Sequence, residues 1–215
     1  MQKAISQAVI KRLPRYYRYL GELMDEGIER ISSSELSQRM KVTASQIRQD
    51  LNNFGGFGHQ GYGYHVPTLY NEIGNLLGVN DHHNMIIIGA GNLGRALANY
   101  ENFSKRGTSI IGVFDNDPSV IGSVTGKHQI KDIKGVEAFV KEHGVDIAAI
   151  CIPKSAAGEV AKNLAGLGVR AFWNFSHMDL ELPEEYIVEN VHLSESLMQI
   201  SYMIQDQDKK REKDK

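Results

Sequence analysis

Cysteine and long apolar runs are scarce in this sequence, and each shortage excludes a class of protein. One cysteine, Cys151, occurs among 215 residues, which excludes an internal disulfide and a cysteine-based zinc site. No apolar run approaches the roughly 18 residues that a membrane span needs, and the N-terminal residues lack the apolar core of a signal peptide. We therefore expect a cytoplasmic protein with no membrane partner.

Net charge is also small, at −2, but the charges are unevenly distributed. Residues 1–18 contain no acidic side chain and carry the basic residues Lys3, Lys11, Arg12, Arg15 and Arg18. A locally basic start on a mildly acidic protein predicts a polyanion contact restricted to one end. Residues 208–215 are mixed in sign and are expected to form a frayed, solvated tail.

Residues 1–80 show the pattern of a DNA-binding domain. Ser32 and Glu35 have the spacing of a capping box, and Thr43 and Gln46 repeat it. Two short helices joined by the tight connection "KVT" predict a helix-turn-helix. The glycine-rich segment "GGFGHQGYGYHV" predicts a β-hairpin with its tip at residues 59–61, and hence a winged helix. The alternative is a plain helical bundle, which can also contain two capped helices in succession.

A different pattern begins after a polar linker at residues 79–84. Apolar strands are expected in "MIIIG", "SIIGVFD", "DIAAICIP" and "VRAFWNF", with amphipathic helices between them. Continuous apolar strands that alternate with helices predict a buried parallel sheet. We therefore expect an α/β, Rossmann-like doubly wound domain over residues 85–192.

The motif Gly89-Ala90-Gly91-Asn92-Leu93-Gly94 follows a strand and opens a helix, the context in which it binds dinucleotides. Its three glycines permit the tight turn, the approach of the backbone to a pyrophosphate, and helix packing on the strand. Asp115 ends the next strand, about 20 residues further on, where an acid binds the adenosine ribose and repels a 2′-phosphate. Asn116 follows it, with no arginine nearby to accept that phosphate. The motif predicts NAD(H); coenzyme A or an adenine nucleotide is the alternative.

Catalytic residues for a dehydrogenase are not evident. Such an enzyme needs a substrate site and a proton-transfer group beside the nicotinamide, and the second half leaves no room for a substrate domain. We place most histidines elsewhere, so only His177 and His192 are plausible neighbours of the site; the others are His59 and His65 (wing), His82 and His83 (linker), and His128 and His143 (surface). The chain is expected to bind the cofactor without catalysis, with a small NAD(H)-dependent oxidoreductase as the alternative.

Nearly the whole chain resembles the Rex family of redox-sensing transcriptional repressors. The matching segments, in order, are "RLPRYYRYL", "VTASQIRQDLNNFGGFGHQGYGY", "GAGNLGRALANY", "CIPKSAA" and "WNFSHMDLELPEEYIVENVHLS". The resemblance implies a homodimer that binds palindromic operators in double-stranded DNA and leaves them when NADH binds, with NAD+ competing for the site. It also implies that residues 193–207 form a domain-swapped helix; the alternative is a helix docked on its own domain.

The resemblance also implies roles for individual residues. The DNA-binding set has Arg48 at the centre of the recognition helix, and comprises Lys41, Thr43, Ser45, Gln46, Arg48, Gln49, His59 and Gln60. Loops along the cofactor contain Ile152, Pro153, Asn174 and Phe175, and Leu193 adds to an apolar lining that favours the neutral reduced ring. The conformational switch is assigned to Arg18, Tyr100 and His192. Many relatives carry Asp where His192 stands, so we expect the contacts between the switch residues to differ in this chain.

Overall fold

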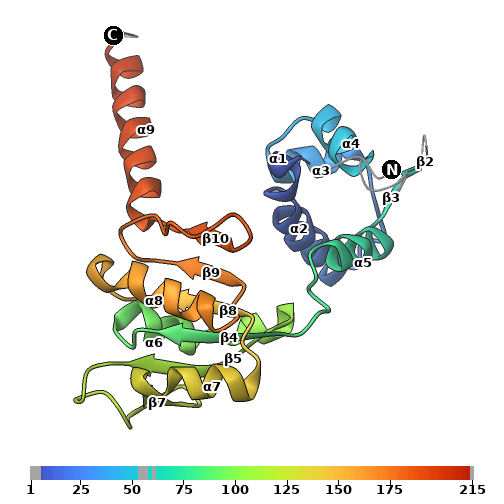
Figure 1. Cartoon of the computed structure of the whole chain (residues 1–215). Coiled ribbons are helices and arrows are strands. Elements are labelled where there is room, and N and C mark those ends of the chain that lie inside the picture. The colour runs from blue at the N-terminus through green and yellow to red at the C-terminus, as the bar shows by residue number, and fades with distance from the viewer. Residues whose placement is uncertain (1–5, 53–57, 60–61, 214–215) are drawn as a thin grey trace. The chain divides into compact units, whose positions relative to one another are not determined.

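The chain separates into two units, Met1–Asp81 and His82–Lys215, with the boundary inside the stretch predicted as a linker (Figure 1). The computed structural model describes residues 6–52, 58–59 and 62–213. Of the helices in those ranges, none is both long enough and apolar enough to cross a membrane.

The first unit is a winged helix-turn-helix. Its sheet has the order β1-β3-β2, with both pairings antiparallel. The predicted hairpin is confirmed by the pairing of His59 with Gly63, while Gln60 and Gly61 lie outside the described residues. The elements are α1 (Gln7–Ile10), α2 (Leu13–Asp25), β1 (Arg30–Ile31), α3 (Ser33–Met40), α4 (Ala44–Asn52), β2 (Gly58–His59), β3 (Gly63–His65) and α5 (Val66–Leu76).

Helical spacing of apolar residues builds the core of this unit. In α2, Leu13, Tyr16, Leu20 and Leu23 recur every three or four residues and are all buried, as an amphipathic helix requires. They join one cluster with buried residues of the neighbouring helices, namely Leu36 and Met40 of α3, Ile47 and Leu51 of α4, and Leu69 and Ile73 of α5.

The two helices of the helix-turn-helix are capped differently. At α3 the predicted capping box is complete, because Ser32 Oγ accepts from the Glu35 amide (3.1 Å) and Glu35 Oε2 accepts from the Ser32 amide (2.8 Å). At α4 the Gln46 amide donates to Thr43 Oγ1 (3.1 Å). The Gln46 side chain, however, donates to Asp50 at 2.7 Å. The second predicted capping box therefore has only the bond from the Gln46 amide to Thr43, and lacks the return bond from the Gln46 side chain.

The second unit is a doubly wound α/β domain around a sheet of order β10-β9-β8-β4-β5-β7-β6. All neighbours in it are parallel except β6 and β7, which confirms the predicted fold class. The strands are β4 (His83–Ile88), β5 (Thr108–Asp115), β6 (Val124–Thr125), β7 (His128–Asp132), β8 (Ile147–Ile150), β9 (Ala171–Asn174) and β10 (Ile187–Asn190). The helices are α6 (Asn92–Ala98), η1 (Glu101–Arg106), η2 (Ile133–Gly135), α7 (Val136–His143), α8 (Lys154–Gly166) and α9 (Leu193–Lys213).

Both faces of this sheet are covered, which is why its central strands are apolar throughout. Along β4, Ile86 and Ile88 belong to a cluster with residues of α7 and α8. Met85 and Ile87 alternate with them and join Ala98 of α6 in a second cluster. A parallel sheet buried on both faces requires such a continuous apolar strand.

Several elements differ from the prediction. One helix was expected after the glycine motif, but the structure has two. Helix α6 ends at Ala98, and the separate helix η1 follows it, with Tyr100 as the N-cap of η1. His83, expected in the linker, is the first residue of β4, and His128, expected at the surface, is in β7 with a buried Nε2. Strands β6, β7 and β10 were not predicted, because they are short and none contains an apolar run of more than two residues.

Helix α9 corrects two further expectations. It runs to Lys213, so residues 208–213 are helical rather than frayed; the pair Lys210–Asp206, one turn apart at 2.6 Å, supports that extension. The alternative in which the helix docks on its own domain is wrong, because side chains from Leu193 to Ile204 are exposed. Figure 1 shows α9 projecting beyond β10.

Candidate functional site

Four loops meet at one edge of the sheet in the second unit. Backbone bonds join the ends of neighbouring strands there: Gly89 N–H donates to Phe114 O (2.8 Å), Cys151 N–H to Ile88 O (2.7 Å) and Phe175 N–H to Ile150 O (2.9 Å). The predicted cofactor segments after β4, β5, β8 and β9 are thus brought together. In doubly wound sheets ligands bind at such a carboxyl edge, where chain connections diverge to either side.

The glycine-rich loop after β4 is closely packed at two positions and open at one. Gly89 has φ +100°, and a Cβ there would lie 2.6 Å from Cys151 O. A Cβ on Gly94 would lie 1.8 Å from Gly89 O. Both positions therefore require glycine. Gly91, at the N-cap of α6, has nothing within 4 Å of its Cβ position. The open backbone at Gly91 and the N-terminus of α6 fit a diphosphate.

Ala90 is held from both sides within this loop. Its N–H donates to Asp115 Oδ2 (2.6 Å), and its carbonyl accepts from Arg95 Nε (2.8 Å). Asp115 Oδ1 also accepts from the Asp117 amide (2.9 Å), so the predicted ribose-binding carboxylate is fixed by backbone donors, with exposed Asn116 beside it. Arg95 was not predicted, because the helical pattern alone gives no sign that its side chain turns back to the loop.

The opposite side of the edge is apolar. Ile152 is half-buried beside Gly89, and Pro153 caps α8 with its ring exposed. Phe175 is half-buried, with its ring centroid 4.6 Å from that of Trp173. Cys151 packs against the cluster that contains Met85 and Ile87, and burial raises the pKa of its thiol to about 12, which disfavours the reactive thiolate at neutral pH.

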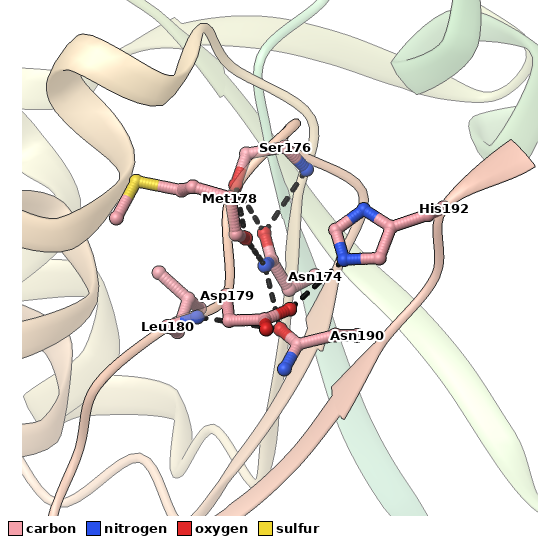
Figure 2. A network of polar contacts seen from close by, with 7 residues as sticks. All are labelled: Asn174, Ser176, Met178, Asp179, Leu180, Asn190 and His192. Carbon is pink, nitrogen blue, oxygen red and sulfur yellow. Dashed lines mark hydrogen bonds and ion pairs between the residues drawn. The ribbon is translucent and has the colours of Figure 1, made fainter. Parts of the chain in front are cut away.

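Asn174 organises the loop that follows β9 (Figure 2). Its side chain is fully buried. Oδ1 accepts from the amide and hydroxyl of Ser176 (3.0 and 2.6 Å), and Nδ2 donates to Met178 O and Asn190 Oδ1 (both 2.7 Å). These bonds occupy both ends of the amide. The loop at 174–180, rather than the Asn174 side chain, can therefore line the site.

His192 is joined to the same loop. Its Nε2 lies 2.9 Å from Asp179 Oδ1, and the two side chains point toward each other in Figure 2. His192 stands between β10 and α9, so the pair links the loop to the base of α9. Asp179 was not predicted, since no local spacing relates it to residue 192.

The two other predicted switch residues lie elsewhere. Tyr100 is half-exposed, with its ring 4.8 Å from that of Phe103. It lines a cavity of about 430 Å³ with residues that include Thr108 and His128. These begin β5 and β7, so the cavity lies at the amino ends of the strands and is separate from the cofactor edge. Arg18 is exposed on α2, with its Nε 3.8 Å from Glu22 Oε1.

The predicted DNA-reading residues form an outer face on α4. Ser45, Arg48 and Gln49 are exposed there, and Arg48 donates to Ser33 Oγ at 3.0 Å. Lys41 and Thr43 are exposed in the turn before α4, where Lys41 adopts a left-handed φ of 53°. The backbone of His59 lies in β2; Gln60 is outside the described residues.

A buried brace holds α4 from behind. The Asp50 carboxylate is fully buried and accepts bonds from Arg12 Nε (2.7 Å), Arg12 Nη2 (2.8 Å), Tyr16 Oη (2.9 Å) and Gln46 Nε2 (2.7 Å). Burial alone would raise the pKa of Asp50, but the hydrogen bonds from Arg12, Gln46 and Tyr16 outweigh it and hold the pKa below its ordinary value. Gln46 thus faces the brace rather than the outer face.

The basic start of the chain is therefore only partly available to a polyanion. Arg12 is committed to Asp50, and Arg15 Nη2 donates to Met40 O at the end of α3 (2.6 Å). Lys11 and Arg18 are exposed, while Lys3 lies outside the described residues. The pairing of Arg12 with Asp50 was not predicted from the sequence, because the two residues are 38 positions apart.

Family models match both units. One described as "Putative DNA-binding protein N-terminus" matches residues 4–52, and one described as "CoA binding domain" matches residues 80–178. A redox-sensing transcriptional repressor Rex of Thermoanaerobacter sp. (strain X514) is 52% identical over 95% of this chain and 91% of that protein.

Two crystal structures of a protein called RSP are similar over the full length. The complex with beta-NAD+ and operator DNA has a TM-score of 0.90 and 50% identity, covering 98% of this chain and 97% of that one. The complex with beta-NADH has a TM-score of 0.90 and 47% identity, covering 98% of this chain and 99% of that one.

Proposed function

The chain belongs to the Rex family of redox-sensing transcriptional repressors, and from that premise we propose that it binds a palindromic operator as a homodimer and leaves it when NADH binds. The observation that carries this proposal is the joint presence, in one chain, of an exposed recognition helix and a glycine-rich loop open at Gly91. RSP, which matches both units, has been crystallised with operator DNA and with each form of the dinucleotide.

The cofactor would be held along the carboxyl edge of the sheet. Residues 89–94 take the diphosphate, Asp115 and Asn116 take the adenosine ribose, and the apolar residues Ile152, Pro153 and Phe175, with Leu193, take the nicotinamide. The two redox forms differ in charge, because the oxidised ring is cationic and the reduced ring is neutral. An apolar lining favours the neutral ring, since burial of an unpaired charge is costly.

DNA binding is assigned to the outer face of α4. Recognition helices enter the major groove and read base edges there, and Arg48 is the side chain suited to guanine. Ser45 and Gln49 share its face. Lys41 and Thr43, in the preceding turn, are placed for phosphates, and the wing around His59 and Gln60 completes the contact.

The proposed dimer explains the exposure of α9. Its apolar side chains, which a single chain leaves exposed, are Leu193, Leu197, Met198, Ile200, Tyr202, Met203 and Ile204. An apolar surface of this kind marks an interaction site, and we assign it to a second copy through a swapped helix. The pair His192–Asp179 joins the base of α9 to the loop beside the nicotinamide edge. A change in that loop would then reach the partner, with Arg18 and Tyr100 as further switch residues.

We also propose that the chain performs no hydride transfer of its own. Its relatives are named as repressors, and His192, one of two candidate proton-transfer groups, is engaged by Asp179. A steady loss of NADH absorbance with small carbonyl substrates would instead support the oxidoreductase alternative. Because a matched family model is described as coenzyme A binding, coenzyme A is the second ligand to test.

The test is a DNA-binding titration with three ligands in parallel. A duplex is first selected from a random-sequence library with the full-length protein, and its binding is then measured with NADH, NAD+ or coenzyme A. We expect recovery of a palindrome, release by NADH, and little release by NAD+. Failure to enrich any sequence would contradict DNA reading, and release by coenzyme A alone would favour the alternative ligand.

A further inference from the structure

Arg95 joins three segments around the glycine-rich loop. Its side chain turns back along α6, so that Nε donates to Ala90 O (2.8 Å) and Nη2 lies 3.5 Å from Ser123 Oγ in the connection after β5. Its own carbonyl accepts from Asn99 Nδ2 (2.6 Å), which also donates to Thr125 Oγ1 (3.1 Å). The half-buried guanidinium is thus fixed at a defined place in the loop.

This arrangement restricts the backbone next to Gly91. Asp115 holds the N–H of Ala90 and Arg95 holds its carbonyl, so the peptide groups on both sides of Ala90 are bonded. Ala90 itself is 2% exposed. Backbone groups held in this way have little freedom to rotate, which keeps the open stretch at Gly91 in a single conformation.

Negative charge also gathers near this loop. Asp115 and Asp117 both place carboxylates at this end of the sheet, where their oxygens accept backbone N–H groups. A diphosphate brought to the same loop would be repelled by them. The seven-residue helix α6 offers only about half a positive charge at its N-terminus. Arg95 adds a full, permanent one, and its partial burial reduces screening by salt.

We propose that Arg95 positions the loop that binds the diphosphate of the cofactor and offsets the charge of Asp115. The inference rests on the proposed binding of NAD(H) and assigns a residue to it. Arg95 acts through Ala90 and through its charge, so it is a positioning residue rather than a direct ligand. The ligand class it serves is any nucleotide that carries a diphosphate.

Three variants separate charge from hydrogen bonding. Arg95→Met removes both, Arg95→Gln keeps a neutral donor, and Arg95→Lys keeps the charge. Arg106→Met, an exposed arginine on η1, is the matched control. Binding of NADH and of ADP-ribose is measured by isothermal titration calorimetry on the full-length protein.

We expect Arg95→Met to weaken both ligands by about 10- to 100-fold, because it removes the charge and the bond to Ala90 O together, and coupling between neighbouring groups reaches this size. Arg95→Lys should recover most of that loss and Arg95→Gln little of it. Arg106→Met should bind like the wild type. Unchanged affinity for both ligands in Arg95→Met would overturn the inference.

A double-mutant cycle with Asp115→Asn tests the charge role separately from a structural one. It compares the loss of affinity caused by Arg95→Met in the two backgrounds, which a purely structural role would leave equal. If Arg95 offsets the carboxylate, Arg95→Met should cost severalfold less affinity in the Asp115→Asn background than in the wild type. Equal costs in the two backgrounds would refute the charge role. Failure of the wild-type protein to bind NADH would instead refute the proposed function itself, and the inference with it.

Discussion

Replacement of Asp50 by Asn should destabilise the first unit strongly, because it removes the charge from a buried brace without leaving a cavity. The carboxylate is fully buried and pairs with an Arg12 side chain that is 24% exposed. Breaking one partner of a buried ion pair costs about 3–5 kcal/mol, and the partial exposure of Arg12 places the expected loss near 3 kcal/mol. A typical unit of about 80 residues has only about 4–12 kcal/mol of stability in total.

A matched control exists in the same unit. Glu26 forms the same two-bond pairing with Arg39 (2.9 and 2.7 Å), but these side chains are 47% and 37% exposed. Glu26→Gln is the same chemical change as Asp50→Asn in a solvated setting. Its effect should be far smaller, because exposed ion pairs contribute little.

Urea unfolding followed with two probes measures this difference. The one tryptophan, Trp173, reports the second unit by fluorescence, while far-ultraviolet circular dichroism reports both units. With a slope of about 1.5 kcal/mol per M, Asp50→Asn should lower the midpoint of the first unit by about 2 M and leave the Trp173 transition in place. Similar shifts for Asp50→Asn and Glu26→Gln would refute the reasoning from burial.

The pH dependence of this loss has a defined sign. The folded-state pKa of Asp50 is lowered, so its stabilisation is complete above the unfolded-state pKa of about 4 and is lost as pH falls through the folded value. The difference between wild type and Asp50→Asn should therefore be constant near neutral pH and shrink below about pH 4. A difference that grew on acidification would show that Asp50 is protonated in the folded protein.

Four further predictions concern the sites. Arg48→Ala should weaken binding to the selected duplex by about 1–3 kcal/mol if it reads a guanine, with little change on random DNA; wild-type affinity would identify another reader. Asp115→Ala should weaken NADH binding and lower its preference over NADPH, as measured by calorimetry, and an unchanged preference would place ribose recognition elsewhere. Cys151 should resist a thiol reagent at pH 8 until urea unfolds the protein, because burial raises the pKa of its thiol to about 12; rapid labelling of the native protein would contradict its burial. Truncation before Leu193 should abolish either dimerisation, in sedimentation, or release by NADH, whereas a truncated dimer with wild-type NADH sensitivity would refute the swapped-helix relay.

Features encoded by local spacing were predicted well. The capping box at Ser32 and the tight turn at Gly89 depend on residues a few positions apart, and both have the geometry that their motifs require. The parallel sheet followed from the continuous apolar strands. The capping box joins residues that are neighbours in the sequence, whereas the strands of the sheet pair with distant strands. What the sequence carries in the second case is the composition of each strand, since burial on both faces requires a continuous apolar run.

Features that depend on distant partners were missed. The brace between Arg12 and Asp50, and the pair Asp179–His192, join residues 38 and 13 positions apart, and neither has a repeating pattern. The short strand β1 exists because Arg30 and Ile31 pair with β3, not because two residues have strand propensity. The helical structure of residues 208–213 was missed for another reason. Their mixed charges are typical of a solvated tail, but Lys210 pairs with Asp206 one helical turn away.

Under the proposed dimer, the exposed apolar face of α9 makes the assembled fraction of this protein depend on its abundance. Residues such as Leu197 and Ile200 are left 66% and 52% exposed by their own chain, so the free energy of covering them is gained only in association. By mass action, dilution of such a dimer lowers its apparent stability and raises the fraction of separated chains. A cell that makes less of the protein would lose assembled molecules faster than in proportion, which couples the strength of its response to the amount synthesised.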